Sequence, residues 1–198
     1  MKKLAVLVSG SGTNLQAIID AIKKGDLKDT EIAIVISNKK DAYALIRAEK
    51  EGIKNLFLDP KQFVTNTDFD KKLVEMFNEL RVDLVVMAGY LKILTEVIVN
   101  AFPKKIINIH PALLPAFGGK GMYGHRVHEA VLKSRVKESG CTVHFVTCNV
   151  DMGPIIGQKK VPVLPDDTVE TLSKRILPEE HKLLVESIKK VLFEKVTV

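Results

Sequence analysis

Short apolar runs recur along the first half of the chain. They occupy residues 4–8 (LAVLV), 32–36 (IAIVI), 55–58 (NLFL), 83–88 (DLVVMA) and 105–110 (KIINIH). The first two are almost continuous stretches of β-branched and aliphatic residues, which are typical of parallel strands covered on both faces. We therefore expect five strands in this half of the chain.

The segments between these runs have a different pattern. Apolar residues recur every three or four positions, as on one face of a helix, over residues 14–24, 41–51 and 69–80. Strands that alternate with helices in this way predict an α/β fold with a doubly wound, mostly parallel sheet.

The alternation ends after Pro111. A glycine-rich stretch, residues 117–125 (FGGKGMYGH), precedes a short helix that we expect over residues 127–134. Apolar runs at residues 141–146 (CTVHFV) and 155–163 (IIGQKKVPV) predict a hairpin-like addition. The complete sheet is therefore expected to have about seven strands.

The last segment, residues 168–195, is amphipathic and predicts a long helix. Pro178 lies within it, and because proline lacks a backbone N–H, we expect the helix to kink or split there. A chain of 198 residues with 46% hydrophobic content can bury one sizeable core, so residues 1–198 are expected to form one domain. Residues 1–110 would be its Rossmann-like half, and residues 111–198 would add loops, two strands and the terminal helix.

Composition and charge narrow the possible partners. Thirty Lys and Arg against 24 Asp and Glu give a net charge of +6, but the basic residues are scattered, so nucleic acid is not expected. The first apolar run is shorter than a signal peptide needs, and no later stretch approaches the roughly 20 apolar residues of a membrane span. We therefore expect a cytoplasmic protein without a membrane partner. Its two cysteines, Cys141 and Cys148, are expected to be small core residues.

A glycine loop, residues 8–19 (VSGSGTNLQAII), joins the first predicted strand to the first helix. A helix N-terminus in this position presents free N–H groups suited to phosphate, and Thr13 and Asn14 could both cap the helix and bind a monophosphate. Leu15 occupies the third glycine position of the dinucleotide fingerprint, and no G-x-x-x-x-G-K-[ST] motif is present. A nicotinamide cofactor and a nucleotide triphosphatase are therefore not expected. The structural alternative is that the glycines only allow close packing and Asn14 caps the helix.

The stretch INIHPALLP, residues 107–115, contains candidate catalytic residues. Asn108 and His110 are two apart on a predicted strand, so their side chains point to the same face, while Ile107 and Ile109 pack against the opposite face. Because the carboxyl ends of parallel strands border the ligand crevice, both polar side chains are expected to reach it.

Asp151, in NVDMGPII, would complete the set by favouring the imidazolium form of His110. The alternative is an ordinary turn aspartate. An amide and an imidazolium together could stabilise a developing oxyanion, as acyl transfer requires. No activated Ser or Cys nucleophile accompanies them, so we expect the attacking group to belong to the substrate.

Six blocks resemble, in chain order, those of the phosphoribosylglycinamide formyltransferase family, the folate-dependent enzymes of purine synthesis. They are SGSGTNLQAII, AGYLKIL, INIHPALLP, TVHFVT, VDMGPII and EEHKLL. The resemblance runs nearly end to end and implies the formyltransferase fold. It also implies transfer of a formyl group from 10-formyltetrahydrofolate to the amine of glycinamide ribonucleotide, with no metal and no nicotinamide.

The same resemblance assigns roles to individual residues. It implies that Asn108, His110 and Asp151 are catalytic. The implied ligands of the ribose phosphate are Gly12, Thr13 and Asn14, assisted by Glu180. The implied folate-binding residues are Leu91, Lys92, Ile93, Leu94, Asn108, Thr147, Cys148, Asn149, Val150 and Asp151.

His144 lies in a matching block and is either a supporting residue near His110 or a satisfied core histidine. Asn66 and Lys92 stand where the family often carries arginine, and neither reproduces the fork of a guanidinium. His125 and His128, three residues apart with no third ligand, are not expected to bind a metal.

Other activities remain alternatives. A methionyl-tRNA formyltransferase would need an added tRNA-binding domain, and a formyltetrahydrofolate hydrolase would carry an extra N-terminal regulatory domain; the chain is expected to have room for neither. From a different class, a non-catalytic module could bind a phosphorylated sugar through the glycine loop. The expected partners are the two small-molecule substrates and, in a possible homodimer, a second copy of the chain.

Overall fold

The computed structural model describes residues 1–194 and has an α/β fold. Its seven strands follow the order β3-β2-β1-β4-β5-β6-β7 in one sheet. The pairs within β1 to β5 are parallel, whereas β6 and β7 are antiparallel. The prediction of a mostly parallel sheet of about seven strands is therefore confirmed. The chain divides into two compact units, Met1–Asn108 and Ile109–Val198.

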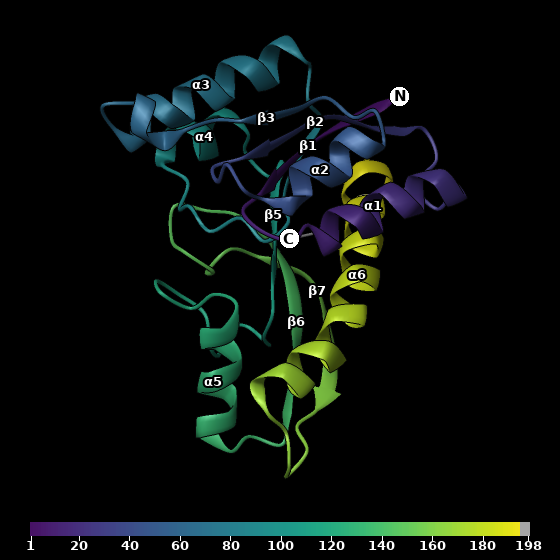
Figure 1. Cartoon of the computed structure of the whole chain (residues 1–198), viewed down its shortest axis with the longest axis vertical. Helices are drawn as coiled ribbons and strands as arrows, with labels where there is room; N and C mark the ends of the chain where they lie inside the picture. Colours follow the sequence, from purple (N-terminus) through teal and green to yellow (C-terminus); the bar gives the residue numbers. More distant parts are fainter. Residues whose placement is uncertain (195–198) are drawn as a thin grey trace. The chain divides into compact units, whose positions relative to one another are not determined.

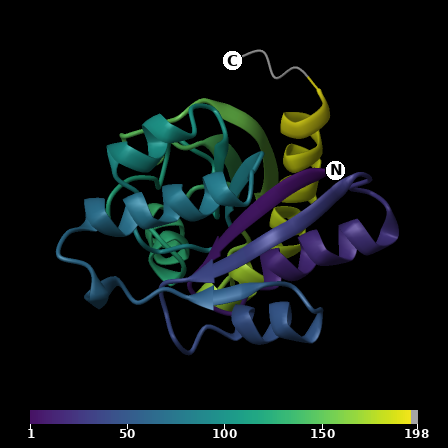
Figure 2. The same ribbon diagram turned by 90° about the horizontal axis from the view of Figure 1, so that it is seen from above.

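The first unit contains the alternating strands and helices. Its elements are β1 (Lys2–Val8), α1 (Thr13–Lys24), β2 (Thr30–Ser37), α2 (Tyr43–Lys50), β3 (Asn55–Phe57), the 3-10 helix η1 (Pro60–Gln62), α3 (Asn66–Glu79), β4 (Leu84–Met87), α4 (Glu96–Ala101) and the start of β5 (Ile106–His110). Strands β1 to β3 lie side by side, with α1 and α2 on one side and α3 on the other (Figure 2). Helix α4 was not predicted, because six residues are too few to show a helical period.

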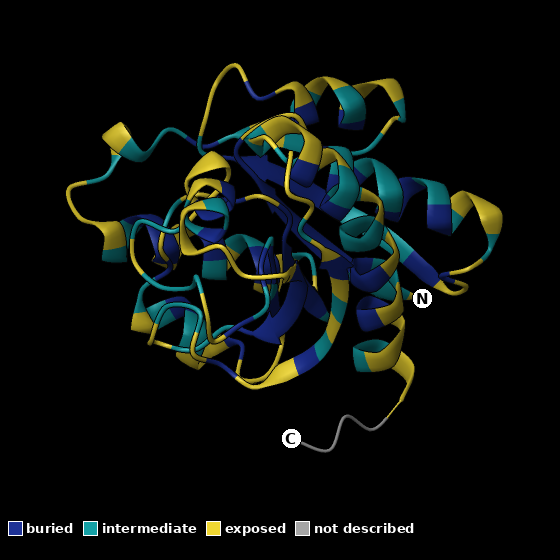
Figure 3. Cartoon of the chain, turned by 90° about the horizontal axis from the view of Figure 1, so that it is seen from below, coloured by how far each residue is buried: buried dark blue, intermediate teal, exposed yellow. Residues whose placement is uncertain are grey.

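The strands of this unit are buried on both faces, as their continuous apolar runs predict. Leu4 to Val8 on β1 and Leu84 to Val86 on β4 have no exposed surface. Figure 3 shows buried strands, while the outward faces of the helices are exposed. Each fully buried aliphatic side chain contributes about 1.5–3 kcal/mol relative to an exposed one, so the strands are a rigid base for the polar residues at their carboxyl ends.

The second unit contains α5 (His125–Ser134), β6 (Glu138–Phe145), β7 (Ile155–Pro162) and α6 (Val169–Phe193). Helix α6 packs along the antiparallel pair β6 and β7 (Figure 1). The predicted hairpin-like addition is thus confirmed, although β6 begins three residues before the expected residue 141.

Helix α6 differs from the prediction at Pro178. Thr168 and Thr171 form a reciprocal capping box at its start, and the helix continues through Pro178 without interruption. The predicted split is therefore wrong. Burial of the face that carries Ile176 and Leu184 stabilises the helix on both sides of the proline, and this offsets the one missing backbone hydrogen bond. The expected last residue, Lys195, lies outside the described residues.

Candidate active site

Strand β5 carries the two predicted catalytic side chains. Ile106 to Asn108 pair with β4, so the strand is held in register up to Asn108. Asn108 is partly exposed, whereas His110 is buried. The spacing of two residues places both side chains on the same face of the strand.

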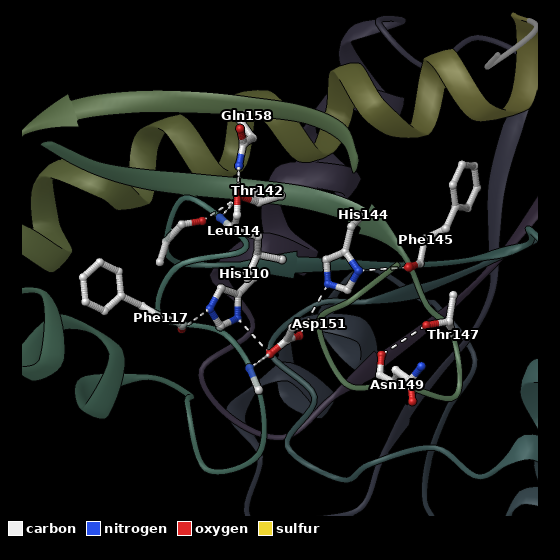
Figure 4. Close-up of polar contacts among 12 residues, drawn as sticks. His110, Leu114, Phe117, Thr142, His144, Phe145, Thr147, Asn149, Asp151 and Gln158 are labelled. Atoms are coloured by element: carbon white, nitrogen blue, oxygen red, sulfur yellow. Dashed lines mark hydrogen bonds and ion pairs between the residues drawn. The ribbon is translucent and has the colours of Figure 1, made fainter. Parts of the chain in front are cut away.

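The chain after β5 is held by a buried hydroxyl. Thr142 on β6 donates from Oγ1 to the Ala112 carbonyl oxygen at 2.6 Å and accepts from the Leu114 N–H at 3.0 Å. The Gln158 amide donates both to the Leu114 carbonyl oxygen at 2.8 Å and to Thr142 Oγ1 at 2.9 Å (Figure 4). Sequence reasoning missed both residues. The sequence could have indicated Thr142, because it lies two residues before His144 and so shares a strand face with it. No sequence pattern singles out Gln158.

The structure brings His110, Asp151 and His144 together (Figure 4). Asp151 Oδ2 lies 3.7 Å from His110 Nδ1, and Asp151 Oδ1 lies 3.5 Å from His144 Nε2. The Asp151 carboxylate is almost buried, and both imidazoles are buried. One carboxylate therefore faces two histidines within a largely desolvated cluster.

Backbone carbonyls on the far side of each ring determine which nitrogen carries hydrogen. His110 Nε2 lies 2.8 Å from the Phe117 carbonyl oxygen, and His144 Nδ1 lies 2.9 Å from that of Phe145. Because a carbonyl only accepts, the neutral tautomers are assigned as Nε2–H for His110 and Nδ1–H for His144. A further proton on either ring would then be added to the nitrogen that faces Asp151.

The electrostatics of the cluster correct one prediction. Burial lowers the pKa of His110 below 6.5, and this exceeds the opposing effects of Asp151 and the Phe117 carbonyl. The expected imidazolium form near neutral pH is therefore wrong. Burial acts to raise the pKa of Asp151, but the hydrogen bond with His144 and the N–H of Gly119 hold it below 3.8, so the carboxylate is ionised.

A glycine-rich segment, residues 117–119, contacts both catalytic groups. The Phe117 carbonyl accepts from His110, and the Gly119 N–H donates to Asp151 Oδ2 at 2.9 Å. At Gly118 a Cβ atom would lie 2.5 Å from Leu114 Cδ2 and 3.1 Å from Asp151 Cβ, so any side chain there would displace Leu114 and press against Asp151. The sequence shows the glycines of this stretch, but it does not predict their contact with the candidate catalytic residues.

The glycine loop lies in the first unit. Gly12 is the N-cap of α1 with a φ of 73°, and a Cβ there would lie 2.6 Å from Ala44 Cβ. Close packing therefore does require this glycine. Asn14 is buried in the first turn and is not the N-cap, so that part of the structural alternative is wrong. Arg47 braces the loop by donating from Nε to the Ser11 carbonyl oxygen at 2.8 Å.

Ser9, at the end of β1, joins this loop to the predicted folate segment, residues 91–94. Its hydroxyl donates to Asn38 Oδ1 at 2.6 Å and accepts from the Leu91 N–H at 2.9 Å. Leu91 and Ile93 are each 48% exposed, whereas Leu94 is buried. Leu91 and Ile93 therefore lie at the surface, whereas Leu94 belongs to the core.

The predicted folate residues of the second unit, Thr147, Cys148, Asn149 and Val150, lie in the turn between β6 and β7, just before Asp151. Thr147 Oγ1 donates to the Asn149 carbonyl oxygen at 3.1 Å and so fixes the shape of this turn (Figure 4). Cys148 is exposed, so its prediction as a core residue is wrong. Cys148 is exposed because it lies in a turn, and the composition of the sequence does not reveal this position.

Cys141 is buried, as predicted, and burial raises the pKa of its thiol to about 12. The nearby Glu180 carboxylate on α6 adds to this rise. Within residues 1–194, no three His, Cys, Asp or Glu side chains are grouped as metal ligands require. In the same part of the chain, no helix is both long and apolar enough to cross a membrane.

Buried histidines make folding stability depend on pH. The pKa values of His110 and His128 both lie below 6.5, chiefly because of burial, so below pH 6.5 the unfolded chain binds protons that the folded chain does not. The free energy of unfolding should therefore fall as the pH drops from 6.5 toward the folded-state pKa values, by at most about 1.4 kcal/mol per pH unit for each histidine. Urea unfolding at pH 5.5 and 7.5 measures this, and His128→Gln should reduce the difference. Equal stability of the wild type at both pH values would contradict it.

Comparisons with known proteins show which family this chain resembles. A family model described as Formyl transferase matches residues 2–188. Over 196 residues the chain is 44% identical to the chloroplastic phosphoribosylglycinamide formyltransferase of Arabidopsis thaliana, covering 98% of this chain and 67% of that protein. It is also 44% identical over 183 residues to the phosphoribosylglycinamide formyltransferase of Haemophilus influenzae, covering 92% of this chain and 84% of that protein. The crystal structure of glycinamide ribonucleotide transformylase 1 from Symbiobacterium toebii has a TM-score of 0.89 and 48% sequence identity, covering 95% of this chain and 86% of that one.

Proposed function

The chain belongs to the formyl transferase family, and from this we propose that it transfers a formyl group from 10-formyltetrahydrofolate to the amine of 5'-phosphoribosylglycinamide in de novo purine biosynthesis. It is an enzyme of the formyltransferase class, and the formyl folate is its cosubstrate. The observation that carries the catalytic assignment is the buried contact of His110 with Asp151, on the strand that also carries Asn108.

In the proposed mechanism the substrate amine attacks the formyl carbon. A new C–N bond forms, and the carbonyl π electrons move to oxygen. The Asn108 amide and the His110 Nε2–H donate hydrogen bonds to this oxyanion, which is a typical way to stabilise a tetrahedral intermediate. The Phe117 carbonyl accepts the same His110 hydrogen, so this contact must open when the oxyanion forms.

The intermediate collapses when the bond from the formyl carbon to the folate N10 breaks. The attacking nitrogen loses a proton, and N10 gains one. Negative charge beside His110 raises the proton affinity of the ring, and a proton on Nδ1 would face the Asp151 carboxylate. Asp151 therefore stabilises the protonated ring during the reaction, although His110 is neutral beforehand.

We assign the substrate sites by residue. The N-terminus of α1, with Gly12, Thr13 and Asn14, supplies free N–H groups for the phosphate, and Glu180 accepts hydrogen bonds from ribose hydroxyls. For the folate, Leu91, Ile93 and Leu94 contribute apolar surface, and Lys92 contributes a positive charge. The turn formed by Thr147, Cys148, Asn149 and Val150 contributes backbone groups.

The absorbance change on loss of the formyl group from 10-formyltetrahydrofolate tests this function. Purified protein should turn over only when 5'-phosphoribosylglycinamide is added. Turnover without it would indicate a formyltetrahydrofolate hydrolase, and no turnover in either mixture would favour a non-catalytic module that binds a phosphorylated sugar.

Gly12→Ala should weaken ribonucleotide binding more than it slows the chemical step. The added methyl group would lie 2.6 Å from Ala44 Cβ on a backbone with φ of 73°, so the loop must shift. We expect KM for the ribonucleotide to rise about 10- to 100-fold, with a smaller change in kcat. The reason is that misplaced N–H groups lose about 1–3 kcal/mol of binding free energy to a charged phosphate. Steady-state kinetics measures both constants. Gly10→Ala, where no atom lies within 4 Å of the Cβ position, is the matched control. An unchanged KM in Gly12→Ala would contradict the assignment.

Both expected partners in the reaction are small molecules. We further propose that the protein acts in the cytoplasm without nucleic acid or a membrane, and that it can form a homodimer. Light scattering of the purified chain distinguishes a monomer from a dimer.

A further inference from the structure

Asp70, on α3, is a fully buried carboxylate that the proposed mechanism does not use. Burial raises its pKa, and the Thr95 N–H, which donates to Oδ2 at 2.5 Å, acts in the opposite direction. Its other oxygen has no hydrogen-bond partner among residues 1–194. A buried carboxylate of this kind is costly, so its position calls for a reason beyond packing.

The bond from Thr95 lies at one end of the predicted folate segment. Thr95 is the N-cap of α4, and residues 91–94 come immediately before it. At the other end of that segment, the Leu91 N–H donates to Ser9 Oγ at 2.9 Å. The segment is thus anchored at both ends by a side chain that accepts a backbone N–H.

Between the two anchors, only part of the segment packs in the core. Leu94 is buried, whereas Leu91 and Ile93 are each about half exposed. The Lys92 side chain extends over the first turn of α3, where its ammonium lies 5.0 Å from the centre of the Phe69 ring and donates to Asn66 Oδ1. Polar contacts with α3 and Ser9 therefore help to determine the shape of this segment, beside the burial of Leu94.

We propose that Asp70 is a positioning residue for the folate site. Its carboxylate holds Thr95, and so holds residues 91–94 in the conformation that receives the folate, while Asp70 itself touches no substrate. This proposal rests on the proposed function, because that function assigns residues 91–94 to the folate.

Asp70→Leu and Asp70→Asn test the role of the acceptor. Asp70→Leu removes it, and we expect KM for 10-formyltetrahydrofolate to rise at least 10-fold, with kcat and KM for the ribonucleotide within about threefold of wild type. Asp70→Asn keeps an oxygen for the Thr95 N–H and should restore a KM near the wild-type value. Asp83→Leu is the matched control, because Asp83 accepts the Lys3 N–H at 2.9 Å before β4, away from the folate segment. It should lower stability and leave KM unchanged.

Thr95→Pro removes the N–H donor of the same bond, together with the threonine side chain, and is used if Asp70→Leu does not fold. Hydrogen exchange at the Thr95 amide gives a readout that needs no activity, and exchange should be faster in Asp70→Leu than in Asp70→Asn. An unchanged KM for the folate in a folded Asp70→Leu or Thr95→Pro protein would overturn the proposal. So would an equal rise of KM for both substrates. Wild-type protein without turnover would instead refute the proposed function, and the exchange experiment would still test whether Asp70 holds Thr95.

Discussion

His110→Ala should leave the protein folded and lower kcat for formyl transfer by about 10³-fold, or about 4 kcal/mol in the transition state. The substitution removes the Nε2–H donor and the site for a proton beside Asp151 at the same time. Its structural cost is the hydrogen bond to the Phe117 carbonyl, about 1 kcal/mol, together with a small cavity. Steady-state kinetics with both substrates, compared with the midpoint of urea unfolding, separates the two effects.

A second buried histidine provides the control for His110. His128, on α5, is also buried, and burial also lowers its pKa, but it has no part in the proposed mechanism. His128→Ala should therefore cost similar stability and keep kcat within a few-fold of wild type. If His110→Ala retained more than a tenth of wild-type kcat, or if both variants lost activity equally, the assignment of His110 as an oxyanion donor would be wrong.

The sequence predicts the fold well where burial is continuous. Strand β1 is apolar along its whole buried length because helices cover both faces, and such runs are visible without a structure. Helix α4 was missed because it is short, and the continuity of α6 through Pro178 was missed because tertiary packing, which is not local, stabilises it. Local pattern thus predicts elements that carry their own signal, and misses those that depend on distant contacts.

In the candidate site, too, some features can be predicted from the local sequence and others depend on distant contacts. The period of two residues on β5 is sufficient to associate Asn108 with His110. The approach of Asp151 to His110 depends on how the turn after β6 folds back, and the sequence could offer it only as one of two alternatives. His110 is neutral because burial lowers its pKa more than the Asp151 carboxylate raises it. The balance between these two effects on the pKa cannot be obtained from residue types alone.

The Asp151 carboxylate contacts both imidazoles, so a substitution of Asp151 affects both contacts. Because carbonyls hold the outer nitrogens of His110 and His144, a proton that enters the cluster lies between a ring and Asp151. Removing the charge of Asp151 therefore removes the effect that raises the pKa of His110, whereas a change at His144 alters only one side of the carboxylate.

Asp151→Asn should accordingly lower kcat by about 10²- to 10³-fold while the fold is retained, because the amide has the shape of the carboxylate but cannot stabilise a protonated His110. Since Asp151 acts to raise the pKa of His110, that pKa should fall further in the variant. The shift is measured by NMR titration of the His110 ring, and the loss of rate by single-turnover kinetics with both substrates bound. His144→Gln removes a bond that lowers the pKa of Asp151 but leaves the carboxylate in place, so its kcat should fall less. A kcat of Asp151→Asn within fivefold of wild type, or an unchanged pKa of His110, would show that the carboxylate does not act through His110.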